Sequence, residues 1–289
     1  MKFVTYSVDG KENVGVLSAD EKNIIPASEL GLVSADMVSL IRELDGALPT
    51  IKGNEKTVSL SDVKLEAPIP EPVQDVICLG LNYRDHAEEA AKSDAAYDVQ
   101  RGDAVYFSKR VNRAVAPFDD IDSNYPVCTE LDYEVELAVV IGKDAKNVKA
   151  ADAGKYIFGY TILNDVSARN QQTKHKQWYY GKSLDGFTPI GPAIVSADKL
   201  GASPKLGIRC YINGEQRQNS STGNMIFDIP YIIEELSAGM TLKAGTVIAT
   251  GTPSGVVLGM DDDKKVYLKK GDVVRCEIDE IGILENTVG

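Results

Sequence analysis

Short apolar segments, separated by glycine, proline and aspartate, constrain the fold of this 289-residue chain more than any other feature. Their length and their content of β-branched and aromatic residues are typical of β-strands. The clearest of these segments are residues 76–79, 105–108, 134–141, 156–163, 208–212, 246–250 and 273–278. Helical patterns are fewer, chiefly residues 85–92 and 229–236. Many strands with few helices predict a mixed α/β, β-rich fold arranged as a sandwich or barrel.

The first 65 residues differ in pattern from the rest and are expected to form a small N-terminal α/β domain. Strand-like residues 2–8 and 13–17 flank a turn at Asp9 and Gly10, and residues 37–44 have a helical pattern. The proline-rich segment 67–72 follows, and prolines stiffen a connector and exclude helix. We therefore expect a domain boundary near residue 65, with a larger domain over residues 66–289.

Composition excludes several classes of partner. The net charge of −12 argues against nucleic acid and anionic membranes, which both require basic surfaces, but leaves a small anionic substrate possible. Residues 1–8 alternate like a strand rather than a secretory signal, and no apolar run reaches membrane-spanning length. The four cysteines form no CxxC pair, and the chain has only two histidines. This pattern argues against a disulfide scaffold and against a zinc site. It is typical of a protein of the reducing cytoplasm.

An acidic face in residues 130–140 provides the first chemical signal. Side chains alternate along a strand, so four acids share a face that continues into apolar Ala138 and Val140: Glu130, Asp132, Glu134 and Glu136. One interpretation is an edge strand with a solvated acidic side. The other is a partly buried carboxylate cluster, which needs a cation because like charges repel; oxygen ligands of this kind suit Mg²⁺ or Mn²⁺.

Asp165 is the acid that bears on this choice. It follows an apolar strand-like run over residues 156–164 and precedes a polar stretch. An aspartate in this position can cap a helix N-terminus. Alternatively it completes a three-carboxylate site with Glu134 and Glu136, leaving coordination positions open for substrate oxygens.

A histidine and a glutamate on a predicted helix form a candidate proton-transfer pair. His86 and Glu89 are three residues apart, which places both side chains on one helical face. A carboxylate beside an imidazole raises its basicity, so the pair is a candidate general base for activating water. The alternative is an exposed helix with ordinary charge pairing. Arg84 and Lys109 are candidate cations for a substrate carboxylate, or else surface charges.

Two further segments carry candidate ligand-binding residues. Lys182 stands in a Gly-Lys-Ser triplet that lacks the upstream glycines of a phosphate-binding loop, so a role in neutralising a developing enolate is preferred. Residues 250–255 contain glycines that allow a backbone to approach a ligand closely, although a plain tight turn explains them equally well.

The order of these motifs resembles that of the fumarylacetoacetate hydrolase family. The resemblance covers residues 66–289 and rests on five segments: NYRDH at 82–86, LDYEVE at 131–136, NDVSAR at 164–169, GKSLD at 181–185 and GTPSG at 251–255. The first 65 residues resemble, less distinctively, the small N-terminal domain of some bacterial members.

The resemblance implies a β-sandwich roll, a homodimer, and Mg²⁺ or Mn²⁺ held by Glu134, Glu136 and Asp165. It implies that His86 with Glu89 activates water. It further implies that Lys182 assists charge stabilisation. Gln172 and Thr252 are implied to contact the oxo-acid end of the substrate.

Members of this family cleave C–C bonds of acylpyruvates and diketo acids, decarboxylate oxaloacetate, or isomerise hydroxy-dienedioates. Our leading expectation from the sequence is metal-dependent hydrolysis of a β-diketo or acylpyruvate-type 2-oxo acid. The alternatives are an oxaloacetate decarboxylase, a 2-hydroxyhepta-2,4-diene-1,7-dioate isomerase or decarboxylase, and a metal-binding regulatory protein without turnover.

Overall fold

A long twisted sheet forms the centre of the computed structural model, which describes residues 1–93 and 102–289, except for the side chains of residues 89–93. Its strand order is β4-β3-β2-β1-β13-β11-β10-β16-β6-β7, with β5 also paired to β1. The strands that follow β1 in this order are β13 (Ile190–Ser196), β11 (Ile157–Asn164), β10 (Val135–Ile141), β16 (Val247–Ala249), β6 (Val76–Gly80) and, at the edge, β7 (Val105–Lys109).

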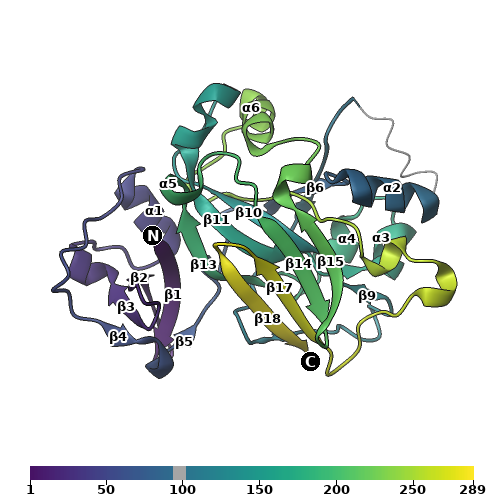
Figure 1. Ribbon diagram of the computed structural model, residues 1–289, viewed down its shortest axis with the longest axis horizontal. Helices are drawn as coiled ribbons and strands as arrows, with labels where there is room; N and C mark the ends of the chain where they lie inside the picture. The colour runs from purple at the N-terminus through teal and green to yellow at the C-terminus, as the bar shows by residue number, and fades with distance from the viewer. Residues whose placement is uncertain (94–101) are drawn as a thin grey trace.

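A second, five-stranded sheet packs against one face of this centre (Figure 1). Its order is β15-β14-β17-β18-β8, and its strands are β15 (Glu215–Ser221), β14 (Gly207–Ile212), β17 (Val273–Ile278), β18 (Gly282–Val288) and β8 (Asp120–Ile121). Alternate residues of β14, β17 and β18 enter a common core with alternate residues of β10 and β11. Two sheets facing one another across an apolar core form a sandwich.

Apart from Glu136, strand β10 is apolar along its length because both of its faces are covered. Val135, Leu137 and Val139 point into the core shared with the five-stranded sheet, whereas Ala138 and Val140 belong to a second core on the opposite face. Since β10 lies between β11 and β16, it is not an edge strand. The edge-strand interpretation of its acidic residues is therefore wrong.

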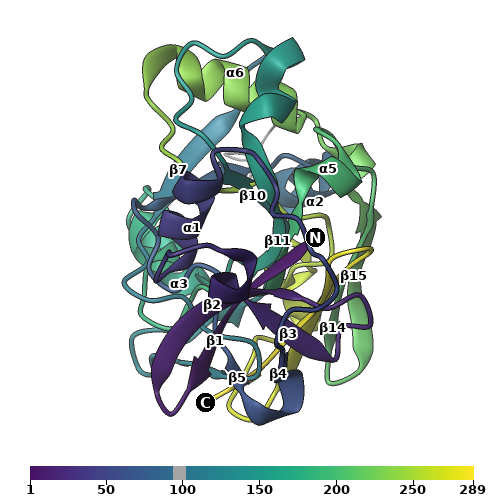
Figure 2. The same cartoon turned by 90° about the vertical axis from the view of Figure 1, so that its left-hand side faces the viewer.

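The N-terminal residues extend the same sheet instead of forming a separate one. The strands are β1 (Lys2–Val8), β2 (Lys11–Leu17), β3 (Asn23–Pro26), β4 (Val58–Ser59) and β5 (Lys64–Leu65). Strand β1 pairs antiparallel with β13, and helix α1 (Met37–Leu44) packs into the second core beside β10. Figure 2 views the molecule from this N-terminal side. A domain division near residue 65 stays a proposal.

The helices that bear on function lie at the other end of the molecule in Figure 1. They are α2 (Arg84–Ser93), α3 (Arg169–Lys174) and α4 (Tyr179–Lys182). A further helix, α6 (Ile229–Gly239), begins with Asp228 as its N-cap and Pro230 in its first turn. In the part of the chain that the structure describes, none of the helices has the length and apolarity needed to cross a membrane.

Candidate active site

Three buried carboxylates lie close together at one end of the β10–β11 strand pair, where β10 begins and β11 ends. The Asp165 N–H donates to the Glu134 carbonyl at 2.8 Å, so these residues oppose each other across the strand pair. Glu136 lies two residues further along β10 and therefore on the same face. One oxygen from each of Glu134, Glu136 and Asp165 lies within 4.8 Å of the others, and all three side chains are buried. We call this set the carboxylate cluster.

Three cations surround the carboxylate cluster. Lys182 Nζ lies 2.7 Å from Asp165 Oδ2 and 2.9 Å from Glu134 Oε2. Arg169 Nη2 lies 2.6 Å from Glu134 Oε1. Burial alone would raise the pKa of Glu134, but the charges of Lys182 and Arg169 outweigh it and lower that pKa to about 2. Glu134 is therefore an anion at neutral pH.

Lys109 is the third cation, and it contacts the carboxylate cluster through Asp165. Its side chain is fully buried, and its Nζ lies 2.7 Å from Asp165 Oδ1 and donates to the Val166 carbonyl at 3.0 Å. Each carboxylate oxygen of Asp165 therefore contacts one ammonium group. Helix α3 has Ala168 as its N-cap, so the helix-cap interpretation of Asp165 is wrong.

Within the described part of the chain, Glu136 forms no ion pair with an ammonium or guanidinium group. The Gly251 N–H donates to its Oε2 at 2.7 Å, and the positive φ of Gly251 (96°) gives the backbone the turn this approach needs. Burial, followed by repulsion from Asp165 and Glu134, raises the pKa of Glu136 well above its ordinary value. A divalent cation with hard oxygen ligands would relieve this repulsion, so the donor set fits Mg²⁺ or Mn²⁺.

Asp132 and Arg169 form a buried support that sequence reasoning did not place in the site. Arg169 Nε lies 2.8 Å from Asp132 Oδ2, and Arg169 Nη1 donates to Gln172 Oε1 at 2.8 Å. Asp132 also accepts the N–H groups of Val257 and Leu258. The signal in the sequence was the position of Asp132 on the same acidic face as Glu134, two residues earlier. Its partner depends on the fold of residues 165–172.

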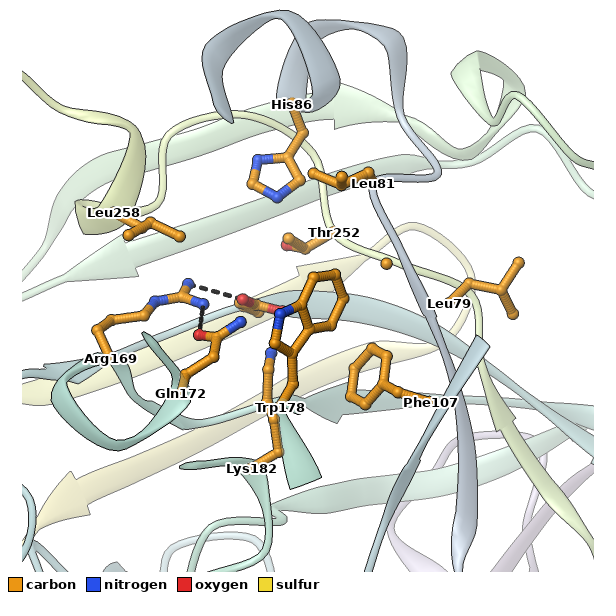
Figure 3. Close-up of a pocket in the computed structure, with 12 residues that line it drawn as sticks. Leu79, Leu81, His86, Phe107, Arg169, Gln172, Trp178, Lys182, Thr252 and Leu258 are labelled. Carbon is orange, nitrogen blue, oxygen red and sulfur yellow. Dashed lines mark hydrogen bonds and ion pairs between the residues drawn. The ribbon is translucent and has the colours of Figure 1, made fainter. Parts of the chain in front are cut away.

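A small pocket opens over the carboxylate cluster (Figure 3). Its polar lining comprises His86, Glu134, Arg169, Gln172, Lys182 and Thr252. Its apolar lining comprises Leu79, Leu81, Phe107, Trp178 and Leu258. The space within it is about 30 Å³, room for about two or three water molecules. In Figure 3 the His86 imidazole points from α2 into this pocket.

The loop between β6 and α2 is fixed by side-chain hydrogen bonds that place His86. Asn82 Nδ2 donates to the Thr250 carbonyl at 2.8 Å, and Asn82 Oδ1 accepts the Phe227 N–H at 2.8 Å. Asp85 Oδ1 accepts the His86 N–H, and Asp85 Oδ2 accepts the Ser254 hydroxyl. Since His86 is only 6% exposed, these anchors hold it above the carboxylates and away from bulk water.

The remaining expected site residues are placed as follows. Gln172 and Thr252 line the pocket, and the Thr252 hydroxyl donates to the Val135 carbonyl while accepting from Gln218. Arg84 is exposed at the start of α2 and is not among the pocket-lining residues described. Glu89 lies in α2, but its side chain falls outside the described part of the structure. The substrate and catalytic roles of all these residues stay proposals.

This arrangement has counterparts in known proteins. The family model for the fumarylacetoacetate (FAA) hydrolase C-terminal region matches residues 75–289. The chain belongs to the fumarylacetoacetate hydrolase family. The family resemblance and the β-rich sandwich fold predicted from the sequence are therefore confirmed.

The relatives of this chain are named after different reactions. Oxaloacetate tautomerase YisK of Bacillus subtilis is 41% identical, with the whole of both chains covered. A solved fumarylacetoacetate hydrolase from Exiguobacterium antarcticum is 38% identical, covering 100% of this chain and 99% of that one with a TM-score of 0.86. A solved 2-hydroxyhepta-2,4-diene-1,7-dioate isomerase from Mycobacterium marinum is 32% identical, covering 100% and 98% with a TM-score of 0.75. The protein is thus similar to family enzymes whose names denote tautomerisation, hydrolysis and isomerisation.

Proposed function

We propose that this protein is a Mg²⁺- or Mn²⁺-dependent enzyme that interconverts the keto and enol forms of oxaloacetate. The observation that carries the proposal is a single imidazole, His86, pointing into a small pocket above a buried carboxylate cluster. Its support from relatives is the 41% identity, over the full length of both chains, to an oxaloacetate tautomerase.

Keto–enol interconversion needs one proton to leave carbon and one to reach oxygen. We propose that His86 accepts the proton from C3 of the keto acid, the C–H electron pair forms the C2=C3 bond as the C2=O π pair moves onto oxygen, and the protonated His86 then gives its proton to that oxygen. The reverse sequence returns the keto form. A pocket that holds little water suits this reaction, because water is not a reactant and desolvation strengthens each electrostatic contact.

The surrounding residues would prepare the charge of the site. Glu134, Glu136 and Asp165 would hold the cation, which polarises the 2-oxo oxygen and stabilises the negative charge that develops there. Lys182 and Arg169 keep Glu134 ionised and offset the negative charge of the cluster. Gln172 and Thr252, on the pocket wall, are proposed to contact the oxo-acid group.

Hydrolysis of an acylpyruvate, the leading expectation from the sequence, is the second candidate. The name of the Exiguobacterium antarcticum relative and the position of His86 favour it, since an imidazole that points into the pocket can also activate water. It differs from tautomerisation in consuming water and breaking a C–C bond. Decarboxylation of oxaloacetate and isomerisation of a dienedioate use the same cluster and remain alternatives.

One experiment separates these reactions. The enzyme with Mg²⁺ or Mn²⁺ is mixed with freshly dissolved enol oxaloacetate, and the enol absorbance and the proton NMR spectrum are followed beside a chelator control. Faster loss of enol without pyruvate formation supports the tautomerase. Pyruvate appearing above the metal-only background indicates decarboxylation. Acetate plus pyruvate from acetylpyruvate indicates hydrolysis. A rate equal to the metal-only background with all substrates would favour a protein without turnover.

The assembly and compartment proposed from the sequence are retained. We propose a homodimer acting in the cytoplasm on a small anionic 2-oxo acid. Size measurement by light scattering tests the first of these points.

A further inference from the structure

Trp178 is the one tryptophan of the chain, and it points inward from an otherwise exposed segment. It lies between α3 and α4, the two short helices that carry Gln172 and Lys182. Residues 173–177 on one side and 179–180 on the other are exposed, whereas Trp178 is half-buried and lines the pocket. The most apolar side chain of this segment is therefore turned toward the candidate active site.

The indole of Trp178 packs against two neighbours, Phe107 and Gly80. Its ring lies edge-to-face on Phe107, with centroids 5.2 Å apart and an interplanar angle of 75°. A Cβ added to Gly80 would lie 2.3 Å from Trp178 Cζ3 and 2.7 Å from Cη2. Gly80 does not have a positive φ, so backbone conformation does not require glycine at this position. The requirement is steric, because the indole occupies the space where a side chain at residue 80 would lie.

The indole also stands beside the charged end of the site. The Lys182 ammonium lies 5.4 Å from the centroid of Phe107, the ring that Trp178 contacts. Trp178, Phe107 and Leu79 thus form an apolar wall next to the polar group of Lys182, Arg169 and Glu134. In a 2-oxo acid held by the polar group, the carbon tail beyond the oxo-acid end would meet this wall.

We infer that Trp178 is a specificity-determining residue that limits the length of the substrate tail. The indole fills the space beside Gly80 and leaves about 30 Å³ in the pocket, room for about two or three water molecules, so a substrate tail that extends toward Phe107 would meet the ring. Longer acyl or dienedioate tails, which would reach the indole, are therefore disfavoured relative to short 2-oxo acids. This inference rests on the proposed function for the identity of the substrate class.

Binding of a homologous series tests the inference without relying on turnover. Mn²⁺-loaded wild type and Trp178→Ala are titrated by calorimetry with 2-oxobutanoate, 2-oxohexanoate and 2-oxooctanoate, and with oxalate as a ligand without a tail. In the wild type, affinity should fall as the tail lengthens. In Trp178→Ala it should rise by up to about fourfold per methylene buried, while oxalate affinity stays within about twofold.

Three further variants keep the test decisive. Trp178→Phe, which preserves an aromatic ring, should give an intermediate dependence on length and serves if the alanine variant fails to fold. Gly80→Ala should push the indole aside and shift selectivity in the same direction as Trp178→Ala. Tyr179→Ala removes a neighbouring aromatic side chain that is 43% exposed, and it should leave the series unchanged.

Tryptophan fluorescence gives an independent signal because the chain has one tryptophan. Adding 2-oxobutanoate to Mn²⁺-loaded wild type should change the emission of Trp178. An unchanged length dependence in a folded Trp178→Ala that binds oxalate normally would overturn the inference. If the length dependence shifts as expected but none of these proteins converts oxaloacetate, the proposed function fails and the role of Trp178 in ligand size stands.

Discussion

The floor and the rim of the candidate site are built differently. The floor is the carboxylate cluster of Glu134, Glu136 and Asp165, fixed by the pairing of two central strands and by buried cations. The rim carries His86 on α2 and Trp178 between α3 and α4, both on short peripheral elements. Strand register fixes backbone positions tightly, whereas surface segments open at lower free-energy cost. We therefore expect the floor to hold the cation, and the rim to supply the proton-transfer group and to limit the size of the substrate.

The largest expected effect comes from the floor. Glu136→Gln keeps the shape and the acceptor for the Gly251 N–H but removes one anionic ligand. We expect Mn²⁺ affinity to fall by more than the roughly 10- to 100-fold that loss of an outer hydrogen-bond partner of a metal ligand costs, and turnover to fall with it. Calorimetric Mn²⁺ titration and the enol assay measure the two effects. Asp144→Asn, at an exposed carboxylate paired with Lys243, is the matched control. Normal Mn²⁺ affinity in Glu136→Gln would place the cation elsewhere.

His86→Gln is the strongest test of the rim. Its side chain can hydrogen-bond but cannot transfer a proton near neutral pH, so we expect turnover to fall about 10²- to 10⁴-fold with Mn²⁺ affinity unchanged. His175, the other histidine, is exposed on the segment after α3, and His175→Gln should retain wild-type rates. If both histidine variants turn over oxaloacetate equally well, His86 is not the proton-transfer group.

The support beneath the floor should govern stability. Asp132→Ala leaves the Arg169 guanidinium, 2% exposed, with one carboxylate partner fewer. Breaking a buried ion pair in this way costs about 3–5 kcal/mol of unfolding free energy. Asp279→Ala, which breaks an exposed pair with Arg209, should cost no more than about 1 kcal/mol. Urea denaturation of both variants measures the contrast, and equal losses would show that burial of the Asp132 pair contributes little.

The floor was predictable from the sequence because its ligands are local. Glu134 and Glu136 share a strand face through the period-two alternation, and Asp165 ends the neighbouring strand. Helix α1 was expected over the residues it occupies, because its apolar stripe and its N-cap at Asp36 are local too. What the sequence left open was which strand lies beside which, and this pairing excluded an acidic edge strand.

The rim and the polar support were harder to predict because they depend on tertiary placement. Nothing local turns Trp178 inward; the space left by Gly80, far away in sequence, does so. Arg169 finds Asp132 only once β9 (Leu131–Asp132) pairs with β12 (Ser167–Ala168). The pattern of apolar segments did not predict strand β15, because this strand is the edge of its sheet and its side chains are mostly polar and partly exposed.

Charge repulsion in the metal-free floor gives a smaller effect with a definite sign. The pKa of Glu136 is raised by burial and by its acidic neighbours, so the folded state holds its proton to higher pH than the unfolded state does. Stability conferred by this group is present below its unfolded pKa, about 4.3, and is lost as pH rises toward its folded pKa. Glu136→Gln has no such proton. With a chelator present, it should therefore be the more stable protein at pH 8, and the difference should shrink toward pH 5.

Thermal unfolding of wild type and Glu136→Gln in a chelator, over this pH range, measures the difference. Adding Mn²⁺ should reverse the order at pH 8 by stabilising the wild type alone, because only a protein whose folded state binds the ion gains stability from it. A wild type that is already the more stable protein without metal would mean that the three carboxylates do not repel as their spacing implies.

The smallest expected effect lies at the end of the molecule opposite the site. Asp36 caps α1 by accepting the Ser39 N–H, and the Ser39 hydroxyl completes the capping box. Asp36→Ala should cost about 1 kcal/mol of unfolding free energy, the typical value for losing an N-cap side chain. Because α1 packs in the core on the opposite face of β10 and supplies none of the pocket-lining residues, the enol-conversion rate should not change. A fall in that rate at unchanged Mn²⁺ affinity would mean that the core shared by α1 and β10 transmits strain to Glu134 and Glu136, and the N-terminal residues would then belong to the working enzyme rather than to its scaffold alone.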